Sequence, residues 1–351
     1  MKQLLLMIAV VALVGCSKDT PETSQAAEAE PQVAPEPSLE PDSVPSAEEK
    51  IISISNPIVE RAVRESLNNL TGELTEAELT KVTLLGLDST QITDEGLKEV
   101  AKFQQLTYLG LGTTKITDAG LEEVAKLHKL KALSLISSMI TDAGLKEVAK
   151  LQKLTRLYLN STEITDAGLK EVAKLQNLEE LSLYNTEITN EGLKEVVKLQ
   201  KLTNLSLPTQ ITDAGLNEVA KLQNLEALKL SKTQITDAGL KDVATLQKLT
   251  NLNLYNNKIT DEGLKEVAKL QNLYILNLRG TQTTDEGLKH VAKLQNLDIL
   301  DLRGTKVTDA GLKHVAKLKK LGLLWLGDIQ ITAEGVAELK KELPNCGIIG
   351  P

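Results

Sequence analysis

The chain has 351 residues, of which 41% are apolar, 25% charged and only 2% aromatic, and its formal net charge is −8. Seven aromatic residues cannot fill an ordinary core of this size, so the core must consist of Leu, Val, Ile and Ala, which favours small identical units. Residues 17–50 contribute −7 to the charge and Lys2 contributes +1, so residues 51–351 carry only −2. A body this close to neutral argues against a nucleic-acid-binding protein, which needs a basic surface. Two cysteines and three histidines also leave little material for a disulfide framework or a metal cluster.

The first sixteen residues have the features of an export signal. Lys2 precedes an apolar run over residues 4–14, and this run is too short to cross a hydrocarbon core of roughly 30 Å as a helix. It therefore predicts a signal peptide. The run ends in Leu-Val-Gly-Cys, which resembles a bacterial lipobox. This resemblance implies a lipoprotein in which residues 1–15 are removed and Cys16 carries a diacylglyceryl anchor in a bacterial membrane, facing the periplasm or the cell exterior. The alternative is an ordinary secretory signal with an incidental cysteine.

Residues 16–50 are predicted to form the lipidated cysteine and a tether. Residues 17–50 hold six of the ten prolines, nine acids and no aromatic residue. Such a segment cannot bury enough apolar surface to offset the entropy lost on ordering, so we expect it to be disordered. It would reach roughly 30 Å as a flexible coil and about 100 Å as an extended polyproline helix.

A 24-residue self-similarity covers residues 82–344 in eleven units, of which unit six has only 23 residues. Positions are numbered from 1 in each unit, and unit four begins at Leu154. Positions 4 and 6 are Leu in every unit, and this period of two predicts a short strand with one face buried. The following Thr-Asp-x-Gly-Leu-x-x-Val-Ala segment has apolar residues three and four apart, which predicts an amphipathic helix capped by Thr165 or Asp166 in unit four.

A strand and a helix within 24 residues cannot bury both of their apolar faces alone, so the units are expected to stack. The result is an α/β solenoid with a parallel sheet on the concave side and helices on the convex side. The Leu-x-x-Leu-x-Leu pattern resembles the leucine-rich repeat family, closest to its ribonuclease-inhibitor-like and cysteine-containing subclasses, and this implies a right-handed horseshoe. Those subclasses have Cys or Asn at position 9, where several units here have Thr. We expect these hydroxyls to satisfy backbone groups at each turn, through Thr90, Thr114, Thr162, Thr186, Thr209 and Thr233.

Both ends of the repeat array are expected to be capped. Residues 51–81 resemble the helical flank that precedes bacterial internalin-like arrays, and residues 345–351 close the other end. Cys346 is interpreted as an unpaired cap residue, with a disulfide to a second subunit as the alternative.

Three positions break the repeat pattern. Unit six lacks one residue and contains Pro208, which removes a backbone donor, so the array should be perturbed there. Thr283 replaces the apolar residue of the other units and brings a hydroxyl into the core. Phe103 stands where the other units mostly have Leu and is expected to fill space beside the N-terminal cap.

No constellation of residues for catalysis or for a cofactor emerges, so the chain is not expected to be an enzyme. The repeated Asp is interpreted as a helix cap, with a calcium-binding row of carboxylates as the alternative. His290 and His314 occupy equivalent helix positions in neighbouring units, but a third metal ligand is lacking, so they are interpreted as solvated. The helical lysines are interpreted as a solvated face with i,i+3 pairs, and contact with anionic envelope polymers is the alternative.

Every Tyr and the Trp fall at unit positions 2, 3, 5, 7 or 8, which are predicted to point outward from the sheet. Exposed aromatic residues beside Arg are common anchors of recognition surfaces. The favoured site is a C-terminal cluster of Tyr255, Arg279 and Arg303 at position 7, with Asp301 and Trp325 at position 5. A rival N-terminal cluster consists of Tyr108, Arg156, Tyr158 and Tyr184, with Ile136 and Glu180 beside them.

The sequence thus favours a membrane-anchored leucine-rich repeat protein that binds a protein or a cell-wall polymer on its concave face, without a metal, a cofactor or a nucleic-acid partner. The alternative is a passive spacer of the cell envelope, in which both clusters only solvate the sheet and Arg303 pairs with Asp301.

Overall fold

The computed structural model describes residues 51–350, which lie within one compact unit, Glu49–Pro351. The predicted signal peptide of residues 1–15, the lipidated Cys16 and the tether up to residue 50 lie outside the described residues, as does Pro351. No helix in the part from 51 to 350 combines the length and the apolar character needed to span a bilayer.

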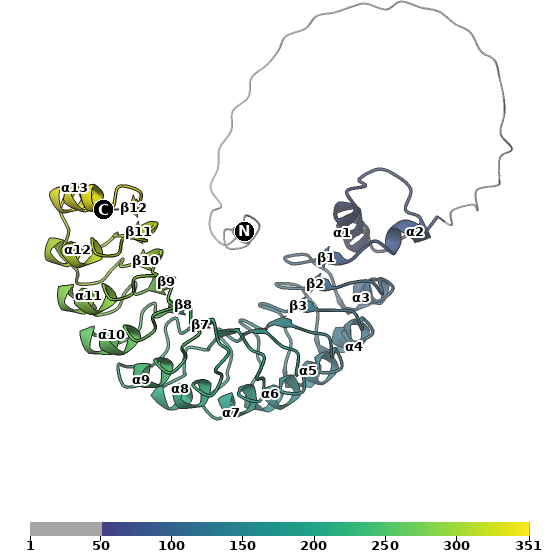
Figure 1. Cartoon of the computed structure of the whole chain (residues 1–351). Helices are drawn as coiled ribbons and strands as arrows, with labels where there is room; N and C mark the ends of the chain where they lie inside the picture. Colours follow the sequence, from purple (N-terminus) through teal and green to yellow (C-terminus); the bar gives the residue numbers. More distant parts are fainter. Residues whose placement is uncertain (1–50, 351) are drawn as a thin grey trace, which may run out of the picture. The chain divides into compact units, whose positions relative to one another are not determined.

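Twelve parallel strands form one sheet in which each strand pairs with the next strand in sequence (Figure 1). Each strand occupies positions 3–5 of its unit, and position 4 pairs with position 4, as in Leu157 and Leu181. The strands are β1 (Leu84–Gly86), β2 (Tyr108–Gly110), β3 (Ala132–Ser134), β4 (Arg156–Tyr158), β5 (Glu180–Ser182), β6 (Asn204–Ser206), β7 (Ala227–Lys229), β8 (Asn251–Asn253), β9 (Ile275–Asn277), β10 (Ile299–Asp301), β11 (Leu323–Trp325) and β12 (Gly347–Ile349).

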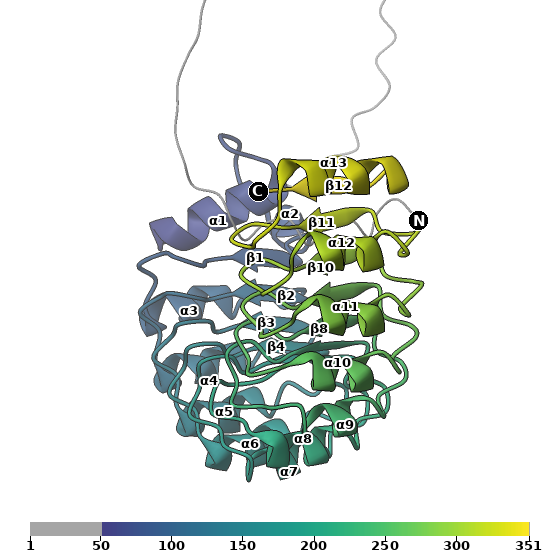
Figure 2. The ribbon, with the colours of Figure 1, turned by 90° about the vertical axis from the view of Figure 1, so that its left-hand side faces the viewer.

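The helices follow the strands one by one and lie on the outer side of the curved array, whereas the strands line its inner side (Figures 1 and 2). This confirms the predicted leucine-rich repeat solenoid. After α1 (Pro57–Leu67) and α2 (Glu76–Leu79), the repeat helices are α3 (Asp94–Val100), a 3-10 turn (Asp118–Gly120) with α4 (Leu121–Val124), α5 (Asp142–Val148), α6 (Asp166–Val172), α7 (Leu193–Val196), α8 (Asp213–Val219), α9 (Leu240–Val243), α10 (Asp261–Val267), α11 (Asp285–Val291), α12 (Asp309–Val315) and α13 (Ala333–Glu342).

The core is a continuous stack of aliphatic side chains between sheet and helices. In unit four, Leu157 and Leu159 point inward from the strand and are fully buried. The helix contributes Leu169 and Val172, each only 1% exposed. Burying one such side chain stabilises the fold by about 1.5–3 kcal/mol. The same set is buried in units one to ten. Stacking therefore supplies the apolar cover that one unit lacks.

The turn after each strand contains a residue in the left-handed backbone conformation, at position 8. Ser161 has a φ of 56°, and its N–H donates to the carbonyl of Tyr184 in the next unit at 2.9 Å. The same conformation recurs at Ser89, Thr113, Ser137, Asn185, Lys232, Asn256, Gly280, Gly304 and Asp328.

Unit six lacks this residue, and the local perturbation expected there is present. Within the described residues the N–H of Asn185 has no backbone acceptor, because the chain at Pro208 takes a shorter path. The side chain of Gln210 fills part of the gap: its Nε2 donates to the carbonyls of Thr186 and Ile188 at 2.8 and 2.6 Å.

The position-9 threonines satisfy a backbone carbonyl in their own unit. The Oγ1 of Thr162 donates to the carbonyl of Leu159 at 2.7 Å, so a buried hydroxyl is paired with a buried acceptor. Five of the six predicted threonines do this; the others are Thr90, Thr114, Thr186 and Thr233. The prediction for Thr209 is wrong, because unit six has lost the turn that would bring this hydroxyl to its carbonyl.

The interpretation of the repeated Asp as a helix cap is also wrong. Thr165 is the N-cap of α6 and accepts the N–H of Ala167 at 3.2 Å, whereas Asp166 reaches into the next unit. Its Oδ1 accepts the N–H of Thr189 at 2.8 Å and its Oδ2 accepts the hydroxyl at 2.6 Å. We call these contacts aspartate bridges; the donor-side threonines are Thr117, Thr141, Thr165, Thr189, Thr236, Thr260, Thr284, Thr308 and Thr332.

The two exceptions to the repeated Asp follow from the same geometry. Asn190 makes an equivalent bridge, since its Oδ1 accepts the N–H of Thr212 at 3.2 Å and its Nδ2 donates to the hydroxyl at 2.8 Å. Ala333 lies in unit eleven, and the described chain has no further Thr-capped helix beyond α13 for it to hold. Both carboxylate oxygens of each bridging Asp accept a hydrogen bond from the next unit, so the bridges account for the repeated Asp without a bound ion.

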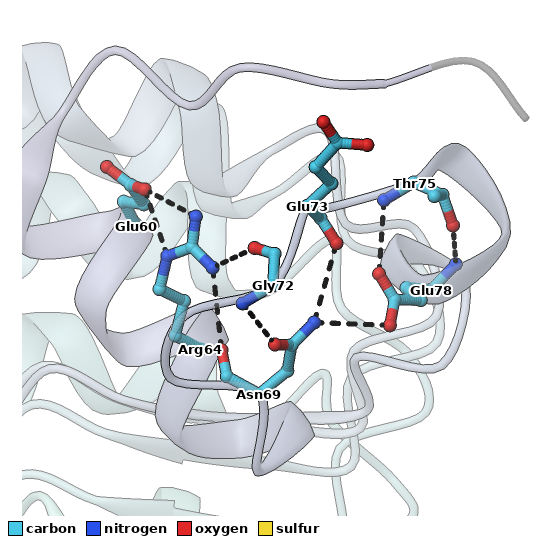
Figure 3. A network of polar contacts seen from close by, with 7 residues as sticks. All are labelled: Glu60, Arg64, Asn69, Gly72, Glu73, Thr75 and Glu78. Atoms are coloured by element: carbon cyan, nitrogen blue, oxygen red, sulfur yellow. Dashed lines mark hydrogen bonds and ion pairs between the residues drawn. The ribbon is translucent and has the colours of Figure 1, made fainter.

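The N-terminal cap is held by a network of polar contacts centred on Arg64 and Asn69. The Arg64 guanidinium pairs with Glu60 at 2.9 Å and donates to the carbonyl of Gly72 at 2.7 Å. The Asn69 side chain accepts the N–H of Gly72 at 2.8 Å. Figure 3 shows how this loop is tied to the capping box of α2, formed by Thr75 and Glu78. The loop between the two helices is therefore fixed by its own side chains.

Glu99 joins this cap to the first repeat. Its two carboxylate oxygens accept the N–H groups of Ser55 and Asn56, each at 3.1 Å, just before α1 begins. Asn56 in turn caps α1 by accepting the N–H groups of Ile58 and Val59. Phe103 is 4% exposed and packs in the core beside the cap, as predicted.

At the other end, part of the predicted cap forms the twelfth strand. Gly347–Ile349 pairs in register with β11 and so covers its edge. Cys346 is free and buried, and burial raises the pKa of its thiol.

Candidate functional site

The outward residues of the sheet occupy positions 3 and 5 of each unit, which lie in the strand, and position 7, which follows the strand. Their side chains are opposite to the buried leucines at positions 4 and 6, because successive side chains of a strand alternate between faces. Neighbouring units place equal positions beside each other, about 4.8 Å apart along the sheet. Each of these positions therefore forms a row that runs across the units.

The helical face is different, because its charges largely neutralise each other. Lys174 pairs with Glu171 of the same helix at 2.7 Å while its side chain remains 60% exposed. Such i,i+3 pairs recur along the array and confirm the interpretation as a solvated face; they are made by Lys98, Lys126, Lys150, Lys194, Lys198, Lys221, Lys265, Lys269 and Lys289. Exposed pairs of this kind contribute only about 0.2–0.5 kcal/mol each.

The structure brings the predicted C-terminal cluster together on strands β8 to β11 and the turns that follow them. The Tyr255 ring lies between two cations: the Arg279 Cζ is 5.3 Å and the Lys232 Nζ 5.8 Å from its centroid. Farther along the same row, the Arg303 Cζ is 5.5 Å from the Trp325 ring centroid. Cations and aromatic rings therefore lie beside one another over five consecutive units, with the two guanidiniums adjacent between the two rings.

Asp301 has a supporting role in this cluster and is not an exposed contact. It is 3% exposed, and its carboxylate holds Arg303 in a bidentate pair with distances of 3.0 Å to Nε and 2.6 Å to Nη2. This hydrogen-bonded carboxylate raises the pKa of the Arg303 guanidinium. The pair is thus more than the surface contact considered from the sequence, because one partner is buried and both oxygens are used.

Arg279 has no such carboxylate. Among the described residues it takes part in no ion pair, and its guanidinium lies over the Tyr255 ring. Its backbone N–H donates to Asn277 Oδ1 at 2.9 Å, just as the N–H of Tyr255 donates to Asn253 Oδ1. Sequence reasoning missed these asparagines, although the recurrence of Asn, Asn and Asp at position 5 in three consecutive units is a visible signal.

The N-terminal cluster is separate, and more of its polar groups are paired with one another. The Tyr158 hydroxyl donates to Glu180 Oε2 at 3.0 Å, and burial together with this carboxylate raises the pKa of Tyr158. Burial likewise raises the pKa of Tyr108, with a smaller contribution from Asp88. Arg156 lies two strands from Tyr108 in the row of position 3 and directly beside Glu180.

Small side chains separate the two clusters. Between Glu180 of β5 and Lys229 of β7, the outward strand positions carry Ser182, Asn204, Ser206 and Ala227. Tyr274 belongs to neither cluster: it stands at position 2, before strand β9, and is 49% exposed beside Asp298. The predicted residues thus form two surfaces and not one continuous site.

The histidine pair on the helical side offers no metal site. In the described part of the chain no group of three or more potential ligands is suitably placed. Burial lowers the pKa of His290 and of His314, and neighbouring lysines lower each pKa further. Nearby carboxylates raise each pKa to a smaller extent, so on balance the surroundings disfavour protonation of both imidazoles.

Comparisons with known proteins agree with the architecture. A family model described as leucine-rich repeat region matches residues 63–250, and a second one described as leucine-rich repeat matches residues 245–268 and 293–316. No curated protein matches the sequence.

Solved structures of similar fold include an internalin (inlF) from Listeria monocytogenes, with a TM-score of 0.51 and 22% identity over 84% of this chain and 95% of that one. An internalin C2 from the same organism has a TM-score of 0.39 and 25% identity, over 80% of this chain and 94% of that one. A structure described as a TDR receptor has a TM-score of 0.48 and 15% identity, over 73% and 49% of the two chains. The first likeness supports the fold alone.

The match to the first family model covers more than half of the 351 residues, and the parallel sheet, the stacked helices and the buried leucine columns are those of its repeats. The chain therefore belongs to the leucine-rich repeat family.

Proposed function

We propose that this protein is a binding protein, not an enzyme, and that the inner face of its sheet holds a protein partner at the C-terminal cluster. The observation that carries the proposal is the row of Tyr255, Arg279 and Arg303 with Trp325 beside it, in which each aromatic ring is in contact with an Arg side chain at the surface. Aromatic and Arg side chains fixed in this way lose little conformational entropy on binding, which is why they dominate the energetics of interfaces.

The helical face supports the choice of the sheet face as the binding surface. Its lysines and glutamates pair within most of the repeat helices and in a similar way from unit to unit, so they do little to distinguish one part of the array from another. The sheet face, in contrast, differs from unit to unit and carries Trp325 and every Tyr except Tyr274, which stands before strand β9. A surface that recognises one partner needs such differences.

Cross-linked pull-downs from a detergent-solubilised cell envelope test this proposal. The bait is the full chain, and the test variant is Tyr255→Ala with Arg279→Ala. Arg303 is left in place, because its removal would leave the buried Asp301 without a partner. A matched control, Lys146→Ala with Lys170→Ala, removes two exposed helical lysines. We expect a partner that is captured by the wild type and by the control but not by the test variant.

Two other outcomes have definite meanings. Capture that survives the test variant but fails with Tyr158→Ala and Tyr184→Ala would move the site to the N-terminal cluster. Equal capture by all variants, or none by the wild type, would favour the alternative of an envelope spacer without a specific ligand.

We further propose that Cys16 anchors this binding protein in a bacterial membrane after removal of residues 1–15. The support is the Leu-Val-Gly-Cys ending of the short apolar run, which lies outside the described residues. The variant Cys16→Ser should appear in the soluble fraction or as unprocessed precursor. Fractionation of this variant with membranes to the same extent as the wild type would refute the anchor.

A further inference from the structure

The C-terminal cluster contains one guanidinium whose charge the described protein does not balance. Arg303 is neutralised by Asp301, which holds it through two hydrogen bonds. Arg279 occupies the same position in the preceding unit and has no carboxylate partner among residues 51–350. Two neighbouring guanidiniums repel each other, and only one of them carries its own counter-charge.

Two lysines in unit seven, on the N-terminal side of Tyr255, are unpaired as well. Lys229 at the end of β7 and Lys232 in the turn after it are exposed, and neither forms an ion pair in the described structure. Lys232 contacts the same Tyr255 ring as Arg279, from the other side. The surface from β7 to β9 therefore has three cations and no anion in ionic contact with them.

An apolar contact surface lies at the far end of this group. The Trp325 ring is partly exposed on β11 and is covered on one side by Arg303. Four strand spacings of about 4.8 Å separate Lys229 from Trp325, which corresponds to about six residues of an extended peptide. One short segment can thus reach both the cations and the ring.

We propose that the C-terminal cluster binds an extended acidic segment of the partner protein, with a carboxylate on Arg279 and an apolar side chain on Trp325. This inference rests on the proposed function and names the chemistry of the partner. A carboxylate fits because a guanidinium offers it two parallel donors, and because Tyr255 already fixes one face of Arg279. The N-terminal cluster does not fit an acidic segment, since Glu180 and Asp88 lie within it.

Selection from a display library of random twelve-residue peptides tests the proposal. The full chain serves as target, beside Arg279→Gln and a matched control, Arg156→Gln, which removes a guanidinium from the N-terminal cluster. We expect peptides selected on the wild type and on the control to be enriched in Asp and Glu near an aromatic or aliphatic residue. The acid enrichment should disappear on Arg279→Gln.

Two synthetic peptides, one with Glu and one with Gln in its place, then measure how much the carboxylate contributes to affinity. The most enriched peptide should bind the wild type about tenfold or more tightly than the same peptide with Gln in place of Glu, as expected for a hydrogen bond to a charged group. On Arg279→Gln this ratio should fall toward one. Competition by inorganic phosphate as strong as by the peptide itself would show that an isolated anion suffices, and would overturn the proposal of a protein segment.

The remaining outcomes separate this inference from the proposed function. Peptides that are selected on the sheet face without acid enrichment, or with the same enrichment on Arg279→Gln, overturn the acidic segment alone. If no peptide is selected on the wild type, both the acidic segment and the proposed function fail.

Discussion

Asp142 holds Thr165 of the following repeat through both of its carboxylate oxygens, with Oδ1 2.8 Å from the backbone nitrogen and Oδ2 2.7 Å from the hydroxyl oxygen. The same threonine caps α6 through its hydroxyl. One side chain therefore fixes the start of a helix that belongs to another unit, and the aspartate bridges repeat this connection along the array.

Replacing Asp142 by Ala should lower the free energy of unfolding by about 1–3 kcal/mol, because two hydrogen bonds to a charged acceptor are lost. Asp142→Asn should cost less, since Asn190 shows that an amide can make both contacts. Urea unfolding measures both variants, and Asn190→Asp serves as the reciprocal control. Equal stability of Asp142→Ala and the wild type would show that the bridges contribute nothing.

Thr283→Ile should stabilise the fold by about 0.5–1 kcal/mol through added apolar burial. Thr283 is fully buried, and its hydroxyl lies 2.8 Å from that of Thr281, which itself donates to the carbonyl of Leu278. Thr283 is therefore the donor of the pair, and its removal leaves no donor unsatisfied. Thermal unfolding tests this, and a lower melting temperature would mean that the hydroxyl pair outweighs the gain in burial.

Arg303→Ala should destabilise more than the double variant Arg303→Ala with Asp301→Asn. The single change leaves the nearly buried Asp301 charge without a partner, whereas the double change removes that charge too. Because the Arg303 side chain is 34% exposed, solvent screens the pair, and we expect a difference of only about 1 kcal/mol. Denaturant unfolding of the four members of the cycle measures it; additive effects would argue against coupling.

The Asn185 amide should exchange with solvent deuterium faster than the Ser161 amide. Ser161 donates to the carbonyl of Tyr184, whereas the corresponding bond of Asn185 is absent because of the deletion in unit six. Amide exchange measured by NMR or mass spectrometry at single-residue resolution compares the two sites. Equal protection would mean that the Asn185 N–H finds an acceptor in solution.

The stability of the C-terminal repeats should fall as the pH drops through the ordinary imidazole pKa of 6.5. The folded state lowers the pKa of His290 and His314, so it favours the neutral imidazoles. Their contribution is complete above pH 6.5 and is lost as the pH falls toward the lower folded pKa. The double variant His290→Glu with His314→Glu should weaken this pH dependence and add about 0.2–0.5 kcal/mol per new pair with Lys293 and Lys317.

Urea unfolding at pH 7.5 and 5.5 tests this, and the reverse change Glu171→His in unit four should introduce the same pH dependence there. Identical pH dependence of the wild type and the double glutamate variant would exclude the histidines as its cause.

The repeat pattern predicted the sheet, the helices and the buried residues because each feature depends on contacts that recur every 24 residues. Leu157, for example, is fully buried and pairs in register with Leu181, and both features follow from the period alone. The twelfth strand was not predicted, since Gly347–Ile349 has no helix after it and so lacks most of the pattern.

Side-chain partners were harder to predict, because a period of 24 residues does not reveal which unit supplies a partner. Asp166 was assigned to its own helix, although its partner Thr189 lies 23 residues farther along. Likewise, the sequence placed Asp301 and Arg303 on the sheet but did not show that Asp301 is buried beneath its partner. Which unit supplies a partner, and which member of a pair is buried, depend on the curvature of the array and on side-chain rotamers.

The missing residue in unit six has a mechanical consequence. The turn-to-turn bond made by Ser161 is absent between units five and six and again between units six and seven, because the first lacks an acceptor and the second a donor. Since repeats contact only their neighbours, stiffness is a local property, and flexing costs least at this point. We therefore expect the array to bend more readily here than between other units. Each side carries one aromatic cluster, so bending at this point would change the span between Tyr184 and Tyr255 while each cluster keeps its own geometry.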